Sequence, residues 1–137
     1  MPENRKLHIL IAEDDADDGE VIVDSFSKHG AFERVDWVKH GRELLDYLDN
    51  ASELPDVILT DINMPILNGI EALEEIAQHS NLRRIPAVVF SSTINPVYKA
   101  RCEKLGTAGF LTKPFTLRGF DEIPDKILSL LETRDTV

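Results

Sequence analysis

Strand-forming segments alternate five times with segments of helical periodicity along this chain. The predicted strands are short, lack regular alternation of apolar and polar residues, and cover Leu7–Ala12, Arg34–Lys39, Asp56–Thr60, Pro86–Ser91 and Gly109–Thr112. Such strands are typical of a parallel sheet that helices cover on both faces. Because crossovers between parallel strands are right-handed, the sequence predicts an α/β fold. We expect a doubly wound, flavodoxin-like sheet of five parallel strands in the order 2-1-3-4-5.

Apolar residues at helical spacing follow each predicted strand. The predicted helices cover Asp17–His29, Arg42–Asn50, a segment opened by Asn68 and Gly69, Asn95–Leu105 and a C-terminal segment. Pro124 interrupts the C-terminal pattern, and proline is well tolerated in the first turn of a helix but not in its interior. Either the last helix is kinked there or it begins near Ile123. We favour the late start, with Thr116–Glu122 forming a turn or a loose first segment.

Length and composition favour one cytoplasmic domain. The chain has 137 residues, which suits a single domain, 1–137, with its core at about 7–132. The single cysteine, Cys102, cannot form an intramolecular disulfide, which excludes a disulfide-stapled secreted scaffold. Met1–Lys6 is polar, so we expect no signal peptide, and no apolar run approaches the ~18 residues of a membrane span. We therefore expect a cytoplasmic protein without membrane contact.

The chain is strongly acidic. Its formal net charge is −10, from 25 acidic and 15 basic residues. A nucleic-acid-binding protein normally carries a basic patch, and none is visible, so we expect no nucleic-acid partner. Part of the acidity lies in Glu13–Asp18, where Asp17 and Asp18 are expected to complement the N-terminal dipole of the first helix.

Chemically active side chains lie at the ends of four predicted strands. Glu13 and Asp14 follow the first strand, Asp61 follows the third, Ser91 ends the fourth and Lys113 follows the fifth. Ligands of open parallel sheets bind at the carboxyl ends of the strands, and the first and third strands are neighbours in the predicted order. The carboxylates of Asp14 and Asp61 should therefore lie close together, where Mg²⁺ would relieve their repulsion.

These residue types suit phosphoryl chemistry. A carboxylate beside Mg²⁺ can act as a nucleophile toward phosphorus and form an aspartyl phosphate. Phosphoryl transfer also requires donors for the phosphoryl oxygens. Lys113 would supply a positive charge, Ser91 a hydroxyl, and the backbone N–H groups after Asp61 the remaining donors. The pattern predicts a phosphoryl acceptor at Asp61.

Four motifs, in this order and spacing, resemble the receiver domain of two-component response regulators over essentially the whole chain. They are HILIAEDD (8–15), PDVILTDINMPILNG (55–69), PAVVFSS (86–92) and GFLTKPF (109–115). The resemblance implies phosphorylation of Asp61 by a histidine kinase, or by a phosphotransfer protein that carries phosphohistidine. It also implies a stand-alone regulator that acts through protein contacts, because the sequence carries no output domain.

The resemblance implies a Mg²⁺ site with a defined set of ligands. Asp14 would bind the metal directly, and Glu13 would act mostly through water. Asp61 would be the third acid of the site, and Asn63 would contribute its backbone carbonyl. Asp15 matches a position at which the family is variable.

The remaining site residues have counterparts in the family. Ser91 takes the Thr/Ser position and Lys113 that of the phosphate-binding lysine. Pro114 would follow a cis peptide bond, and Gly69 would let the chain turn closely past the acidic site. Phe110 occupies the aromatic switch position. On phosphorylation Ser91 should move toward the phosphoryl group and Phe110 should rotate inward.

This switch would alter the face formed by the fourth helix, the fifth strand and the fifth helix. A downstream partner, or a second copy of the chain in a homodimer, would dock there. In addition, the segment Asn81–Pro86 resembles stand-alone regulators that are paired with bacterial phytochrome-type kinases.

Two other functions use a fold of this class. A Mg²⁺-dependent phosphohydrolase would also use Asp61 as its nucleophile, but hydrolases of the haloacid dehalogenase type place a second acid two residues later, where this chain has Asn63. A flavin-binding electron carrier needs a Ser/Thr/Gly-rich phosphate loop after the first strand, where Glu13–Ala16 would repel a phosphate. We therefore expect a signalling module and no enzyme beyond its own phosphorylation and dephosphorylation, with the phosphohydrolase as the alternative.

Overall fold

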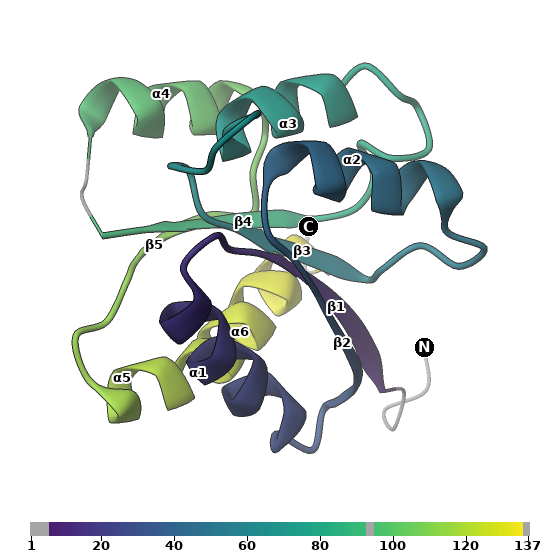
Figure 1. The fold of residues 1–137 in the computed structure, drawn as a ribbon. Helices are drawn as coiled ribbons and strands as arrows, with labels where there is room; N and C mark the ends of the chain where they lie inside the picture. Colours follow the sequence, from purple (N-terminus) through teal and green to yellow (C-terminus); the bar gives the residue numbers. More distant parts are fainter. Residues whose placement is uncertain (1–5, 93–94, 136–137) are drawn as a thin grey trace.

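The computed structural model describes residues 6–92 and 95–135, so residues 1–5, in which a signal peptide would begin, lie outside it. Its centre is a sheet of five parallel strands in the order β2-β1-β3-β4-β5 (Figure 1). The strands are β1 (Leu7–Ala12), β2 (Phe32–Val38), β3 (Val57–Thr60), β4 (Ala87–Ser91) and β5 (Gly109–Thr112). The predicted fold class and strand order are confirmed.

Helices cover both faces of the sheet. They are α1 (Ala16–Ser27), α2 (Gly41–Asn50), α3 (Gly69–Ile76), α4 (Pro96–Lys104), α5 (Leu117–Asp121) and α6 (Ile123–Asp135). Helices α2, α3 and α4 lie on one face, and α1, α5 and α6 lie on the other (Figure 1). The sheet thereby separates two apolar cores.

Strand residues alternate between these two cores, because successive side chains of a strand point to opposite faces. In β1, Leu10 and Ala12 join the core beneath α2, α3 and α4, whereas Ile9 and Ile11 join the core beneath α1 and α6. All four side chains are fully buried. This two-sided burial explains why the strands read as nearly continuous apolar runs.

Polar caps fix the helix starts next to the strand ends. The Asn68 side chain accepts a hydrogen bond from Glu71 N, and the Glu71 side chain accepts one from Asn68 N, which completes a capping box at α3. Asn95 caps α4, with Pro96 as its first helical residue. The α3 and α4 starts agree with the sequence prediction.

The last helix begins late, as predicted from Pro124. Helix α6 starts at Ile123, which places the proline in its first turn. The preceding segment contains a short helix of its own, α5, whose N-cap Thr116 accepts a hydrogen bond from Gly119 N at 3.0 Å. The expected loose segment is therefore a capped helical turn.

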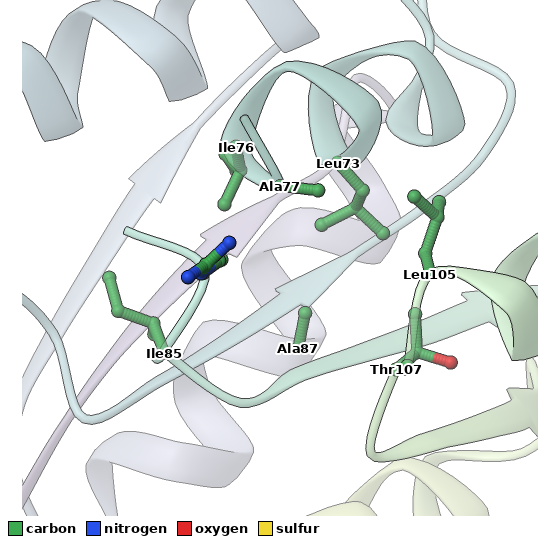
Figure 2. Close-up of a pocket in the computed structure, with 9 residues that line it drawn as sticks. Leu73, Ile76, Ala77, Ile85, Ala87, Leu105 and Thr107 are labelled. Carbon is green, nitrogen blue, oxygen red and sulfur yellow. The ribbon is translucent and has the colours of Figure 1, made fainter. Parts of the chain in front are cut away.

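A small cavity lies at the amino-terminal edge of the sheet, opposite the strand ends with the acidic residues. Figure 2 shows it between the ends of α3 and α4 and the start of β4. Its volume is about 40 Å³, and its wall combines apolar side chains such as Leu73 and Ile76 with polar groups that include Arg83. Such a space has room for about one water molecule, so it does not carry the chemistry predicted from the sequence.

Within the described residues, no helix has the length and apolarity that crossing a bilayer would require.

Trp37 of β2 packs directly against helix α1 at Gly19. A Cβ atom placed on Gly19 would lie 2.0 Å from Trp37 Cζ2, far inside van der Waals contact. The indole Nε1 donates a hydrogen bond to Glu13 O at 2.9 Å, which ties the same ring to the end of β1. The absence of a side chain at Gly19 therefore sets how closely α1 approaches the sheet.

We expect Gly19→Ala to lower the free energy of unfolding by about 2 kcal/mol, because the methyl group would overpack against Trp37. Alanine in an unhindered helix would instead stabilise by roughly 0.5–1 kcal/mol. The matched control is Gly30→Ala, since a Cβ there would meet no atom within 4 Å. Urea denaturation followed by circular dichroism measures both variants, and equal stability of the two would contradict this packing.

Candidate functional site

Asp61 lies directly after β3, where backbone contacts hold it at the carboxyl edge of the sheet. Its N–H donates to Ala12 O at 3.0 Å, and its carboxylate Oδ1 accepts from Ile62 N at 2.7 Å. The residue is only 6% exposed. A buried carboxylate with one oxygen fixed by the backbone keeps its other oxygen for further chemistry.

The loop after Asp61 folds back tightly on the site. A Cβ atom on Gly69 would lie 2.0 Å from Asp61 O, so only glycine permits this close approach. Within the loop, Ile66 has a φ of 71°, and Leu67 N donates to Pro65 O at 2.7 Å. A positive φ at a β-branched residue is strained by about 1–3 kcal/mol. The strain lies five residues beyond Asp61, in the loop that encloses it.

Three carboxyl groups meet at this edge of the sheet. Glu13, Asp14 and Asp61 each offer one carboxylate oxygen, and these oxygens all lie within 4.8 Å of one another. The parallel register explains the meeting, because Ala12 of β1 is paired with Thr60 of β3. Glu13 is fully buried, whereas Asp14 is exposed.

Lys113, directly after β5, reaches into this acidic cluster. Its backbone N–H donates to Ser91 O at 2.8 Å. Its ammonium Nζ lies 2.5 Å from Glu13 Oε1, 2.9 Å from Asp61 Oδ2 and 3.1 Å from Asp18 Oδ2. Burial disfavours the charged ammonium, but the hydrogen bonds and charges of Glu13 and Asp61 outweigh that effect and raise the pKa of Lys113. The lysine is firmly charged.

Glu13 has the opposite balance. Burial is the largest influence and raises the pKa of its carboxyl to about 7, and the negative charge of Asp61 acts in the same direction. The contact with the Lys113 ammonium and a hydrogen bond from Asp15 N partly oppose the rise. A carboxylate that is this costly to ionise would gain from a further cation beside it.

The residues fit a small divalent metal ion. The buried Glu13 Oε1 faces the Lys113 ammonium as an ion pair, but among the described residues it has no hydrogen bond of acceptable geometry. All three groups of the cluster offer hard carboxylate oxygens, which Mg²⁺ prefers, and the exposure of Asp14 leaves room for metal-bound water. The donor set and the poorly satisfied buried oxygen therefore suit a hydrated Mg²⁺.

The other predicted residues surround the cluster at different depths. Ser91 is the last residue of β4 and is 1% exposed. Phe110 of β5 is partly buried against the core beneath α2, α3 and α4. Asn63 is exposed, two residues after Asp61. The topology thus brings Asp61, Lys113 and the acidic pair into contact, with Ser91 at the end of the adjacent strand.

The expected cis peptide bond before Pro114 is wrong. All peptide bonds among the described residues are trans, including the one between Lys113 and Pro114. Trans is the lower-energy form of an X–Pro bond by roughly 0.5–1 kcal/mol. Lys113 reaches its acidic partners with this trans bond.

Sequence reasoning assigned Asp18 to the helix dipole and missed its contact with Lys113. Asp18 lies in the first turn of α1, and its N–H donates to the N-cap Asp15 Oδ1 at 2.8 Å. Phe90 is a second missed neighbour, because its ring centroid lies 5.2 Å from Lys113 Nζ. Asp14 precedes the N-cap of α1, so helical spacing does not relate it to Asp18; the available signal was the place of Asp18 in the first turn of the helix that follows the acidic strand end.

The family is decided by comparison with known proteins. The family model of the response regulator receiver domain matches residues 9–124. The chain belongs to this family. Receiver domains are signalling domains that accept a phosphoryl group and interact with histidine kinases or phosphotransfer proteins, and they bind Mg²⁺ at an acidic pocket.

Individual relatives agree with the receiver-domain assignment. The two-component response regulator ORR11 of Oryza sativa subsp. indica is 35% identical over 107 residues, which cover 78% of this chain and 71% of ORR11. The phosphorylated cyanobacterial phytochrome response regulator RcpA is 30% identical, with a TM-score of 0.82 over 89% of this chain and 91% of RcpA. The Mn²⁺-bound form of response regulator Rcp1 is 26% identical, with a TM-score of 0.80 and coverages of 90% and 92%. Some curated relatives are much longer, and this receiver domain spans 16% of one and 13% of another.

Lys113→Met tests the ion pairs of this receiver domain. The substitution leaves buried carboxylates without their cation, so in metal-free buffer we expect the free energy of unfolding to fall by about 3 kcal/mol. The control is Lys126→Met, because the exposed Lys126 side chain forms no ion pair among the residues described; its effect should stay within about 0.5 kcal/mol. Denaturation with a chelator present measures both, and similar values for the two variants would contradict the role of Lys113.

Proposed function

We propose that this receiver domain accepts a phosphoryl group from a phosphohistidine onto Asp61, with Mg²⁺ bound at the acidic cluster. The donor would be a histidine kinase or a phosphotransfer protein. The observation that carries the proposal is the 2.9 Å contact between Lys113 Nζ and the buried Asp61 Oδ2, beside the cluster of Glu13, Asp14 and Asp61. It combines a nucleophilic carboxylate, a firmly charged lysine and hard metal ligands in one place.

In the transfer, an Asp61 carboxylate oxygen forms a bond to phosphorus while the bond between phosphorus and the histidine nitrogen breaks. The electron pair of that bond stays with the imidazole. Lys113 donates to a phosphoryl oxygen, and Ser91 donates its hydroxyl to another. Bound Mg²⁺ would supply charge neutralisation for the phosphoryl oxygens. Asp14, Asp61 and the Asn63 carbonyl would hold it directly, and Glu13 mostly through water.

The phosphohydrolase alternative is not favoured. An acid that protonates a leaving group is required two residues after the nucleophile in the hydrolases considered above. That position is Asn63, whose amide has no acidic proton to give. Family membership likewise supports a signalling role.

The proposed stand-alone regulator acts through protein contacts on the face of α4, β5 and α6. Helix α6 is the C-terminal helix that the sequence analysis counted as the fifth. Val97 on this face is 66% exposed, and Tyr98 and Phe110 are only partly buried. Such apolar side chains suit a protein partner or a second copy of the chain. The kinase itself is proposed to be of the phytochrome type, because RcpA and the bacteriophytochrome response regulators RtBRR and AtBRR are among the similar solved structures.

Asp61→Asn should abolish phosphorylation, because an amide oxygen is a far weaker nucleophile than a carboxylate. Incubation of the wild-type protein with acetyl phosphate and Mg²⁺ should add one phosphoryl group, detected by intact-protein mass spectrometry. Asp49→Asn is the matched control on the exposed surface of α2 and should react like the wild type. Undiminished labelling of Asp61→Asn would overturn the assignment.

Asp14→Asn should weaken Mg²⁺ binding by roughly tenfold or more, because it removes a direct ligand. Asp15→Asn should change the affinity by less than about twofold, since Asp15 caps α1 and asparagine is an equally good cap. The single tryptophan, Trp37, donates a hydrogen bond to Glu13 O, beside the proposed metal site. Its fluorescence therefore gives the signal for the titration. Equal losses in both variants would show that the ligand is misassigned.

Ser91→Ala should leave phosphorylation possible but weaken the response of Phe110. The phosphoryl group can shift the switch only through interactions that differ between its two states, and the Ser91 hydroxyl supplies one of them. Aromatic NMR of Phe110, with and without beryllofluoride, compares the wild type with Ser91→Ala. Identical spectral changes in both proteins would exclude the hydroxyl as the coupling element.

A further inference from the structure

Three carboxylates already contact the Lys113 ammonium before any phosphoryl group arrives. An ammonium carries three N–H donors. Three carboxylates surround it, those of Glu13, Asp61 and Asp18, at 2.5, 2.9 and 3.1 Å. The ammonium donates hydrogen bonds to Asp61 and Asp18 and forms an ion pair with Glu13, so a phosphoryl oxygen that approaches Lys113 must compete with these carboxylates.

The three contacts differ in what their loss would cost. Glu13 is fully buried, and its Oε1 faces the ammonium alone among the described residues. Asp61 is the acceptor itself, and its side chain is 9% exposed. The Asp18 side chain is 37% exposed, so water can replace Lys113 as its partner. The contact with Asp18 is also the longest of the three. Since partly exposed ion pairs contribute little to stability, it is the least costly to release.

Asp18 is held in place independently of Lys113. It occupies the first turn of α1, where its N–H is bound by the Asp15 cap at 2.8 Å. The positive end of the helix dipole stabilises its carboxylate there. A negative charge is thus fixed beside the lysine, outside the metal-ligand cluster of Glu13, Asp14 and Asp61.

We propose that Asp18 is a positioning residue that competes with the phosphoryl group for Lys113. In the resting protein one N–H donor of the ammonium is bound to the Asp18 carboxylate. On arrival of the phosphoryl group, Lys113 turns this donor to a phosphoryl oxygen, and the Asp18 carboxylate is hydrated. Asp18 thereby raises the free-energy cost of reaching the phosphorylated state. The inference rests on the proposed phosphoryl-acceptor function of Asp61.

Beryllofluoride binding at saturating Mg²⁺ tests this competition without any catalytic turnover, with Trp37 fluorescence as the signal. Asp18→Asn should bind beryllofluoride about fivefold more tightly than the wild type, because it removes the charged competitor. Asp18→Glu, which restores a carboxylate within reach of Lys113, should return the affinity toward the wild-type value. The rate of phosphorylation by acetyl phosphate should rise in Asp18→Asn by a similar factor.

Asp17→Asn is the matched control, because it removes the same charge one residue earlier in the same helical turn. Asp17 is exposed and forms no side-chain hydrogen bond or ion pair within the described part of the chain. The affinity of Asp17→Asn for beryllofluoride should stay within about twofold of the wild-type value. An unchanged or weaker affinity of Asp18→Asn would overturn the inference, as would an equal gain in Asp17→Asn. A wild-type protein that binds no beryllofluoride would instead overturn the proposed function, and the inference with it.

Discussion

The ammonium of Lys113 holds together a cluster that would otherwise repel itself. Three carboxylates contact it, two from residues that directly follow β1 and β3 and one from α1, and the first two lie in the protein interior. Buried like charges without a cation would protonate or force the chain apart. Because Lys113 directly follows β5 and its backbone bonds to Ser91 of β4, the same residue also fixes how the far edge of the sheet meets the site.

This arrangement depends on the parallel sheet. All five strands end at one edge, so residues from four distant parts of the sequence meet without a specialised scaffold. The order β2-β1-β3-β4-β5 places β1 beside β3, which brings Glu13 and Asp14 to Asp61. Trp37 of β2 then bonds to Glu13 O, so the other edge of the sheet supports the acidic pair as well.

The fold and the acidic cluster could be predicted because they follow from strand patterns and strand ends. The late start of α6 followed from Pro124, whose ring suits a first turn. Three features were not accessible in this way. The contact between Asp18 and Lys113 depends on side-chain reach across 95 residues of sequence, and the close packing of Trp37 on Gly19 depends on the height of α1 above the sheet. The bond before Pro114 was expected to be cis from the family resemblance, and it is trans.

The electrostatics of the resting site favour the exchange of partners that we propose for Lys113. Three carboxyl groups, those of Glu13, Asp18 and Asp61, contact one ammonium, and a fourth, that of Asp14, lies close to Glu13 and Asp61. Burial is the main cause that raises the pKa of Glu13 to about 7, and the negative charge of Asp61 adds to the rise. A divalent cation beside Asp14 would offset part of this negative charge. It would not change the number of N–H donors that Lys113 offers. A phosphoryl group on Asp61 would add roughly −1.5 to −2 charges and several acceptor oxygens, for which the lysine would redistribute its hydrogen bonds. The most exposed of its partners is the one that water can most readily replace, and that partner belongs to α1. On the proposed function, the first turn of α1 is therefore electrostatically linked to the state of Asp61, although it contains neither the proposed acceptor nor a proposed metal ligand.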